Sequence, residues 1–426
     1  MRGDRVRRVD GHVLVDPTDS RFLGDRGGPL RSVRWQITPA EFQDVIRKLR
    51  FRYFKWDAFV TGSLNVVPES IVLSQEEHEE IVGLAERLAA ILRDIERRAK
   101  ACPEVLRRIG IPGPVAELIA REPDSPLQLA RYDFFPRPEG GWAVSEFNED
   151  VPGGFNEVIA AAELLGQHHP GLRFVDRFAE RFLAALPDSG RIALMYATGY
   201  SEDMQHMLVL ESLLQARGQP TVLCSPRHLG MWFGKPTVHG QRIAAAVRFY
   251  PGEWFALLEN HRTWKRAADR LSMMNPLTRL ISQSKAVFAV WDEPDMVSCT
   301  DRDWLHTLAP HTEYFSPQQE SELVARPADW VIKANFGRMG ENVVMGSLVT
   351  SDEWFRTIRE VQGCPQDFVI QRCFSVAPME FSDGPRFPAI GAFLINGRFA
   401  GYYSRIASQP FLTHQATYVP TVVDPQ

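Results

Sequence analysis

Apolar residues that recur every three or four positions predict one long amphipathic helix in the first quarter of the chain. Its apolar face consists of Ile81, Leu84, Leu88, Ile91, Leu92 and Ile95. This is the spacing of a helix that packs one side on a core. Ser74 and Glu77 have the spacing of a capping box, so we expect the helix to begin there. Five prolines between residues 101 and 127 then predict an irregular connection.

Shorter apolar runs bounded by turn residues predict strands in the middle of the chain. We expect a hairpin over residues 128–148 and a helix near 156–166. A strand, a helix and a strand come next, an order typical of a βαβ unit with a parallel sheet. Their expected ranges are 191–197, 202–218 and 221–224. Ser201 is expected to cap this helix and Gly218 to end it.

The last third of the chain has the pattern of antiparallel strands. The runs DWVIK and NVVMG flank a glycine-containing turn at 335–340, and a helix capped by Thr350 and Glu353 is expected over 352–362. The strand DFVIQRCF follows, and two further apolar runs meet at Asn396-Gly397, a strong hairpin signal. The pattern as a whole predicts a mixed α/β (α+β) protein whose C-terminal part is rich in antiparallel strands.

Length and composition narrow the class of protein. A chain of 426 residues has room for roughly two or three domains. Shifts in composition divide it into four expected segments, 1–127, 128–184, 185–300 and 301–426. A net charge of -5 argues against a nucleic-acid partner. Five scattered cysteines indicate reduced thiols and a cytoplasmic protein. No apolar run approaches the roughly 18 residues of a membrane helix, so no membrane partner is expected; the oligomeric state stays open.

The segment from Ser145 to Glu157, SEFNEDVPGGFNE, carries the first candidate chemistry. Glu146 and Asn148 lie two positions apart after an apolar run, so in a strand they point to the same face. Asp133 is in the preceding candidate strand. Three oxygen ligands on neighbouring strands suit Mg²⁺, which is usually held by one or two carboxylates together with substrate phosphates. The alternative is a pair of ordinary solvated carboxylates on a hairpin.

A second set of residues fits the phosphates and base of a nucleotide. Lys333 ends an apolar strand, and the glycines of the following turn let backbone N–H groups approach phosphate oxygens. Lys285 precedes another apolar run. The backbone around Gln371, Arg372 and Cys373 is placed to read an adenine edge. The alternatives are a plain hairpin turn, a surface lysine and a core strand, but together with the carboxylates these residues make the inventory of an ATP–Mg²⁺ site.

Five segments in this order resemble the synthetase part of glutathionylspermidine synthase and related circularly permuted ATP-grasp ligases. They are ARYDFF, VSEFNEDVPGGFNE, SQSKAVFAVW, VIKANFGRMG and VIQRCF. The metal strands precede the lysines, as in the permuted family, and the resemblance covers roughly residues 50 to 423. It implies a circularly permuted ATP-grasp fold with an additional βαβ-containing substrate domain.

The resemblance also implies roles for individual residues. The ligands of one or two Mg²⁺ ions would be Asp133, Glu146 and Asn148. ATP would be bound by Lys285, Lys333, Gly337, Gly340, Gln371, Arg372 and Cys373. The transferring phosphoryl group and the acid substrate would meet Arg131, Arg338 and Arg405. Acidic groups in the substrate cleft would be Glu202 and Asp203.

The chain also departs from that family. We expect no N-terminal cysteine amidase half, because too few residues precede Phe51. Val151, Pro152 and Gly153 occupy the stretch where the family's small hydroxyl residues contact glutathione, and Ala334 replaces the usual proline after the loop lysine. We therefore expect an ATP- and Mg²⁺-dependent carboxylate–amine ligase that forms an acyl phosphate and joins a different small-molecule or peptide acid and amine. The alternatives are a non-catalytic ATP-binding regulatory or partner module and a phosphotransferase that stops at phosphorylation.

Overall fold

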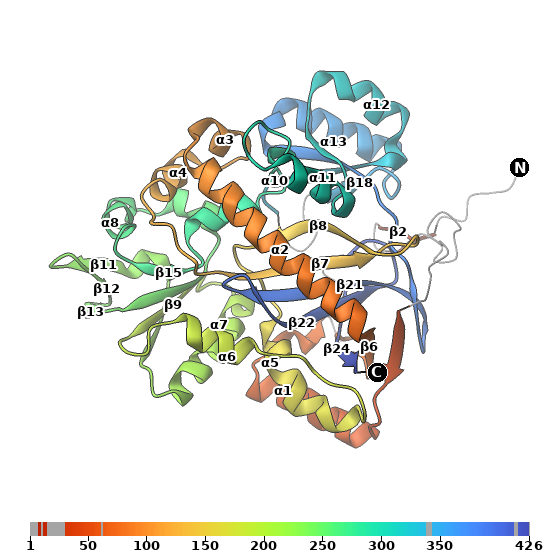
Figure 1. The fold of residues 1–426 in the computed structure, drawn as a ribbon, viewed down its shortest axis with the longest axis horizontal. Coiled ribbons are helices and arrows are strands. Elements are labelled where there is room, and N and C mark those ends of the chain that lie inside the picture. Colours follow the sequence, from red (N-terminus) through yellow and green to blue (C-terminus); the bar gives the residue numbers. More distant parts are fainter. Residues whose placement is uncertain are drawn as a thin grey trace, which may run out of the picture.

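The computed structural model describes residues 7–9, 12–14, 30–60, 63–337, 343–412 and 416–425. Within these ranges the chain is a mixed α/β protein in which two antiparallel sheets and one parallel sheet form the main layers (Figure 1). No described helix is both long enough and apolar enough to cross a bilayer.

The central antiparallel sheet has the strand order β23-β22-β21-β7-β8, with β20 pairing β21 at one end. Both predicted hairpins lie in this sheet and are confirmed. Asn396 and Gly397, at the second hairpin, have φ angles of 52° and 75°, as its two-residue turn requires. The strands are β7 (Leu129–Pro136), β8 (Trp142–Asn148), β20 (Met379–Phe381), β21 (Gly384–Ile395), β22 (Arg398–Ala407) and β23 (Thr417–Val419).

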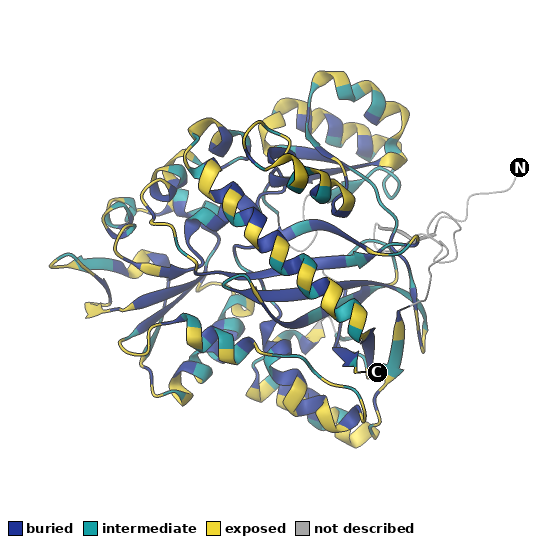
Figure 2. Cartoon of the chain, in the orientation of Figure 1, coloured by how far each residue is buried: buried dark blue, intermediate teal, exposed yellow. Residues whose placement is uncertain are grey.

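Helix α2 (Gln75–Lys100) covers one face of the central sheet, and α5 (Phe155–Leu165) and α6 (Phe178–Ala185) cover the other (Figures 1 and 2). The alternation of β21 explains this sandwich, because Leu394 packs into the core with α2 while Phe393 packs into the core with α5 and α6. The predicted capping box of Ser74 and Glu77 is present at the start of α2.

The second antiparallel sheet has the order β16-β19-β17-β18 and carries its own small core. Trp330, Ile332 and Ile370 of the sheet pack against Trp354 and Ile358 of α13. The two predicted strands pair with each other and the helix capped by Thr350 is confirmed, whereas residues 338–340 of the predicted turn lie outside the described residues. The elements are β16 (Thr312–Tyr314), β17 (Trp330–Ala334), β18 (Val343–Met345), β19 (Phe368–Arg372), α12 (Glu320–Ala325) and α13 (Ser351–Gly363).

The predicted βαβ unit belongs to a parallel sheet of order β10-β9-β14-β15. Gly218 follows its helix with a φ of 77°, as expected of a helix end. The expectation for Ser201 is wrong, because the helix begins one residue earlier than a Ser201 cap requires and Tyr200 is the cap, without a side-chain hydrogen bond. The elements are β9 (Ile192–Tyr196), α7 (Ser201–Ala216), β10 (Thr221–Cys224), β14 (Ala245–Phe249) and β15 (Ser272–Met274).

The remaining strands form small sheets. They are β11 (Leu229–Trp232), β12 (Lys235–Val238) and β13 (Gln241–Arg242); β3 (Arg31–Arg34), β6 (Glu69–Ser74) and β24 (Thr421–Asp424); β4 (Phe59–Val60) with β5 (Ser63–Leu64); and β1 (Arg7–Val9) with β2 (His12–Leu14).

The proline-rich stretch 101–127 is more regular than the sequence predicts. It contains two short helices, α3 (Pro103–Arg108) and α4 (Gly113–Ile119), each with a proline in its first turn. Proline is tolerated there because the first-turn N–H has no intrahelical partner. The other helices are α1 (Pro39–Arg52), α8 (His261–Ala267), α9 (Leu280–Gln283), α10 (Val287–Val290) and α11 (Cys299–Leu308).

Candidate functional site

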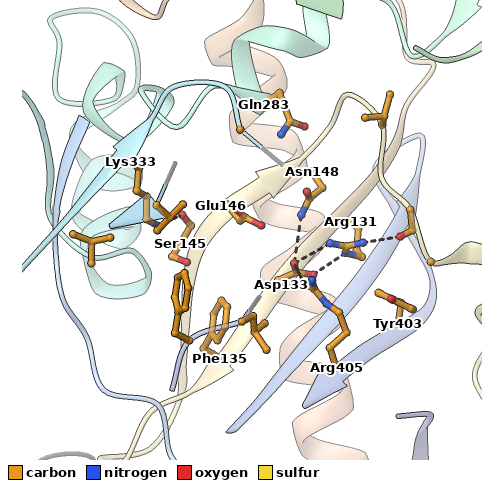
Figure 3. Close-up of a pocket in the computed structure, with 18 of the residues that line it drawn as sticks. Arg131, Asp133, Phe135, Ser145, Glu146, Asn148, Gln283, Lys333, Tyr403 and Arg405 are labelled. Atoms are coloured by element: carbon orange, nitrogen blue, oxygen red, sulfur yellow. Dashed lines mark hydrogen bonds and ion pairs between the residues drawn. The ribbon is translucent and has the colours of Figure 1, made fainter. Parts of the chain in front are cut away.

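The strand β7 separates a core face from a polar face. Tyr132 and Phe134 are fully buried in the core that includes α2, and alternation turns Arg131 and Asp133 to the opposite side. There they line a cavity of about 300 Å³ to which both antiparallel sheets contribute (Figure 3). Lys333 of the second sheet lines the same cavity, so residues about two hundred positions apart in the chain converge on one site.

A β-bulge turns the polar residues of β8 toward this cavity. Tyr132 pairs with Phe147 and Phe134 with Val144. Two residues of β8, Ser145 and Glu146, therefore lie opposite the single residue Asp133. In a regular strand Val144, Glu146 and Asn148 would share a face, yet Val144 is in the core while the other two line the cavity. The extra residue of the bulge resolves this conflict.

Asp133 holds two arginines together at the floor of the cavity (Figure 3). Its Oδ1 accepts from Arg131 Nε at 2.8 Å, and its Oδ2 accepts from Arg131 Nη2 at 3.1 Å and Arg405 Nη2 at 2.6 Å. Asn148 Nδ2 is 3.4 Å from the same Oδ2. Burial alone would raise the pKa of Asp133, but the two guanidinium groups hold it below its usual value. Two cations and one anion leave a net positive charge.

Gly391 of β21 makes room for this cluster. It pairs with Asp133 on one side and with Tyr403 on the other. A Cβ at this position would lie 2.3 Å from the Tyr403 carbonyl oxygen and 2.9 Å from both Arg131 Cδ and Asp133 Oδ1. The absence of a side chain is what lets the Arg131–Asp133 pair fold over β21 and meet Arg405 of β22.

Two buried lysines lie near Glu146. Lys333 Nζ donates to the Ser145 carbonyl oxygen at 3.1 Å, and Lys285 Nζ donates to the Gly337 carbonyl oxygen at 3.3 Å. Lys285 Nζ is also 3.8 Å from Glu146 Oε2. Burial lowers the pKa of Lys333 to about 8, and the opposing effect of Glu146 is smaller. An anionic ligand such as a phosphate would restore the protonated state of this lysine.

The oxygen donors fit Mg²⁺ only in company with a ligand that brings its own oxygens. Among the described residues, no group of three or more histidine, cysteine, aspartate or glutamate side chains is arranged to hold a metal ion. Asp133 already accepts from two arginines, which leaves Glu146 and Asn148 as the more available donors. This matches the usual Mg²⁺ site of one or two carboxylates plus substrate phosphates.

The far end of the cavity is suited to a flat apolar ring. Val331, Met345 and Phe374 line it together with Gln371 and Cys373. The side chain of Arg372 does not join them. It donates to Glu322 Oε1 at 2.7 Å and lies over the Trp330 ring, so only its backbone remains for the predicted contact with adenine.

The opposite end of the cavity is acidic and contains a neutral histidine. Glu202 and Asp203, in the first turn of α7, line it as predicted, together with Asp57. His206 Nδ1 donates to the Glu202 carbonyl oxygen at 2.8 Å, and its Nε2 accepts from Gly154 N at 3.0 Å. Burial lowers the pKa of His206 to about 4, so the ring is neutral near pH 7.

Several residues of the cavity were not predicted from the sequence. Tyr403 lies two positions before Arg405 on one strand, and His206 follows Glu202 by one helical turn, so period counting from the predicted residues would have found both. Gln283 lies in the quoted segment SQSKAVFAVW but was assigned no role, and Asp57 follows from no pattern in the sequence. The predicted Gly337 lines the cavity, whereas Arg338 and Gly340 lie outside the described residues.

The sequence profile described as glutathionylspermidine synthase preATP-grasp matches residues 39–424. The fold is similar to that of a glutathione synthetase-like effector from Globodera pallida in its apo form, with a TM-score of 0.59 and 11% identity over 91% of this chain and 98% of that chain. A putative gamma-glutamylcysteine synthetase from Methylobacillus flagellatus KT has a TM-score of 0.42 and 11% identity over 80% of this chain and 87% of that chain, too distant to support an argument. No curated protein matches the sequence.

The likeness to the Globodera pallida structure concerns the fold alone, and it bears out the expected mixed α/β class. The profile match adds the family, because it extends over nearly all of the described chain and includes every strand that contributes to the cavity. The chain therefore belongs to the glutathionylspermidine synthase preATP-grasp family.

Proposed function

We propose that this protein is an ATP- and Mg²⁺-dependent carboxylate–amine ligase that works through an acyl phosphate. Family membership supports a ligase-type role. The observation that carries the finer proposal is the cavity that Lys333, the Glu146–Asn148 pair and two arginines line together. Lys285, which is buried, lies beside it with its Nζ 3.8 Å from Glu146 Oε2. Phosphoryl transfer needs this combination of cationic groups and metal ligands more than it needs a nucleophilic side chain.

In this proposal different residues of the site bind the phosphates, the adenine and the metal. Lys285 and Lys333 bind the ATP phosphates, and the apolar end near Met345 takes the adenine. Glu146 and Asn148, with Asp133 beside them, hold the metal, which supplies Lewis-acid stabilisation of charge on the phosphoryl oxygens.

The two arginines act on the acid substrate. A carboxylate oxygen attacks the γ-phosphorus, the bond to the bridging oxygen breaks, and ADP leaves with the electron pair. Arg131 and Arg405 stabilise the resulting acyl phosphate, because their charge exceeds that of Asp133 by one. The amine nitrogen then attacks the acyl carbon, inorganic phosphate leaves, and the nitrogen gives up a proton. Glu202 and Asp203 provide negative charge for an incoming ammonium group.

The test is phosphate release from Mg²⁺–ATP with panels of carboxylates and amines, followed by product masses. We expect a product of mass acid plus amine minus water only when both are present. Glu146→Ala and Lys333→Ala are expected to lower the rate at least about 10²-fold, as for loss of an electrostatic stabiliser. Arg398→Ala, on an exposed stretch of the same sheet, is the matched control. Tight ATP binding without turnover would contradict the ligase and favour a non-catalytic ATP-binding module. A stable phosphorylated acid, formed without an amine, would favour a phosphotransferase.

A further inference from the structure

The β11–β12 hairpin ends in two exposed aromatic side chains. Trp232 is 68% exposed and Phe233 89% exposed, and their rings touch edge to face at 5.1 Å between centroids. Figure 1 shows the β11–β13 sheet at the margin of the molecule, projecting away from the central sheet, and Figure 2 shows its end as exposed surface. The pair belongs neither to the cavity nor to a hydrophobic core.

The turn at this tip carries a residue that its backbone disfavours. Phe233 and Gly234 have φ angles of 44° and 75°. The hairpin at Asn396-Gly397 has nearly the same angles, 52° and 75°, with asparagine in the first position. Asparagine adopts a positive φ readily, whereas for a bulky aromatic residue it is a true outlier. A strained and exposed phenylalanine weakens the fold, which indicates that the side chain has a use in contact with something else.

The surroundings of the tip are basic although the whole chain is acidic. Between Glu211 and Glu253 the sequence has no aspartate or glutamate, in a chain of net charge -5. Lys235 and Arg242 are exposed on the hairpin sheet itself. Arg270, also exposed, donates through Nη1 to the Gly234 carbonyl oxygen at 3.4 Å behind the turn, and its charge is partly balanced by Asp269, whose Oδ1 is 3.6 Å from Arg270 Nε. Lys235 and Arg242 therefore supply most of the positive charge near the tip. The tip therefore combines apolar rings at its apex with cations behind them.

We propose that this hairpin tip, residues 232–235, docks the protein on the surface of an anionic lipid bilayer. Aromatic rings favour the boundary between headgroups and acyl chains, and the cations behind them would lie at the level of the lipid phosphates. A convex apex of two side chains is too small for a stable protein interface, which needs about 800 Å² from each partner. This peripheral contact differs from the sequence-based expectation of no membrane partner, and it is independent of the proposed ligase activity.

The experiment is co-sedimentation of the full chain with vesicles of phosphatidylcholine alone and of phosphatidylcholine mixed with phosphatidylglycerol. We expect binding to the mixed vesicles only, weakened by added salt because screening reduces the attraction of the basic residues. Trp232→Thr/Phe233→Asn is expected to reduce the bound fraction at least about tenfold. Asparagine suits the turn, so this variant should unfold at the same temperature as the wild type or higher.

Two further variants test whether binding needs the basic residues of the hairpin and whether an exposed aromatic residue elsewhere has the same effect. Lys235→Glu/Arg242→Glu should also abolish binding to mixed vesicles, whereas Phe51→Ser, at a residue 70% exposed on α1, should leave it unchanged. Absence of wild-type binding to the mixed vesicles would overturn the proposal, and so would equal binding by the tip variant. Self-association or protein binding that depends on the tip, without vesicle binding, would overturn it in favour of a protein partner. ATP turnover in solution should be the same for all these variants.

Discussion

The charges of individual residues decide what the cavity can hold. Asp133 was predicted as one of three metal ligands, but both of its oxygens accept hydrogen bonds from arginines. Its first role in the structure is therefore to orient Arg131 and Arg405. The sequence places Asp133 and Arg131 on one strand, but it cannot show that Arg405 meets them, because this depends on the strand order β22-β21-β7 and on the missing side chain of Gly391.

Gly391→Ala tests how tightly this cluster is packed. The new methyl group would lie far inside contact distance of the Tyr403 carbonyl oxygen, a backbone atom that cannot rotate away. We expect the free energy of unfolding to fall by about 1–3 kcal/mol, the usual effect of overpacking. Gly83→Ala is the control, because nothing lies within 4 Å of its Cβ position on α2, and alanine should stabilise this helix by about 0.5–1 kcal/mol. Equal stability of the two variants in urea denaturation would contradict this packing.

The lowered pKa of Lys333 leads us to expect that nucleotide binding depends on pH. Its pKa is about 8 in the free protein, and bound phosphates would raise it. Binding of Mg²⁺–ATP near pH 8 should therefore take up protons, and the affinity should fall by up to about tenfold per pH unit above that value. Titration calorimetry in buffers of different ionisation enthalpy measures the uptake. Lys333→Arg should bind without this proton uptake, and persistence of the uptake in that variant would assign it to another group.

Lys333 also makes the stability of the free protein depend on pH, but stability rises with pH where the affinity for ATP falls. The pKa of Lys333 is lower in the folded state than the ordinary value of 10.5, so the unfolded chain binds more protons between about pH 8 and pH 10.5. The contribution of this group to the stability of the free protein is therefore unfavourable below pH 8 and rises with pH through that window.

At the scale of the elements, hydrophobic periodicity predicted α2, α13, the βαβ unit and both hairpins of the central sheet. It could not predict the bulge in β8. Counting by twos from Val144 places Glu146 on the core face, and only the pairing register with β7 shows that Ser145 and Glu146 share one partner. A bulge depends on contacts between strands, which the pattern along one strand does not contain.

Two serines that the sequence predicts as helix caps can be compared directly, because the structure confirms Ser74 as a cap but not Ser201. Ser74→Ala removes a side-chain acceptor for the backbone N–H of Glu77 and should lower the free energy of unfolding by about 1 kcal/mol. Ser201→Ala should have a much smaller effect, because Ser201 lies inside the first turn of α7 and is not its cap. Thermal unfolding of both variants measures the difference. A larger loss for Ser201→Ala would restore the sequence-based assignment.

At the scale of the whole molecule, a buried ion pair joins the central sheet to the parallel sheet. Asp150 follows strand β8, and its Oδ1 accepts from Arg248 of β14. Arg248 also donates to the carbonyl oxygens of Asn275 and Pro276, while Asn275 bonds to the backbone of Leu129 on β7. The end of β8 that carries Asn148 is therefore fixed to the parallel sheet, whose helix α7 carries Glu202 and Asp203.

Arg248→Met tests this connection. It removes the buried guanidinium that pairs with Asp150, and loss of one member of a buried ion pair should lower the free energy of unfolding by about 3–5 kcal/mol. Arg177→Met breaks a solvent-exposed pair with Glu180 and should change it by no more than about 0.5 kcal/mol. Similar urea midpoints for the two variants would show that the buried pair does not hold the sheets together.

Most of the residues predicted from the resemblance and the order of motifs line the cavity, although they are distributed from Arg131 to Arg405. The resemblance did not supply Asp57 and His206, which lie outside the five quoted segments, and it assigned no role to Gln283, although this residue lies in the segment SQSKAVFAVW. Nor could it show that Arg372 turns its side chain away, because this follows from the position of Glu322 on α12.

The central proposal is that a carboxylate is activated by ATP before an amine attacks it. The most direct measurement uses carboxylates labelled with heavy oxygen, incubated with Mg²⁺–ATP, an amine and the protein. Activation through an acyl phosphate transfers one labelled oxygen to the released phosphate and leaves one in the amide, which mass spectrometry of both products detects. Release of unlabelled phosphate alone, with or without an amide product, would contradict the account.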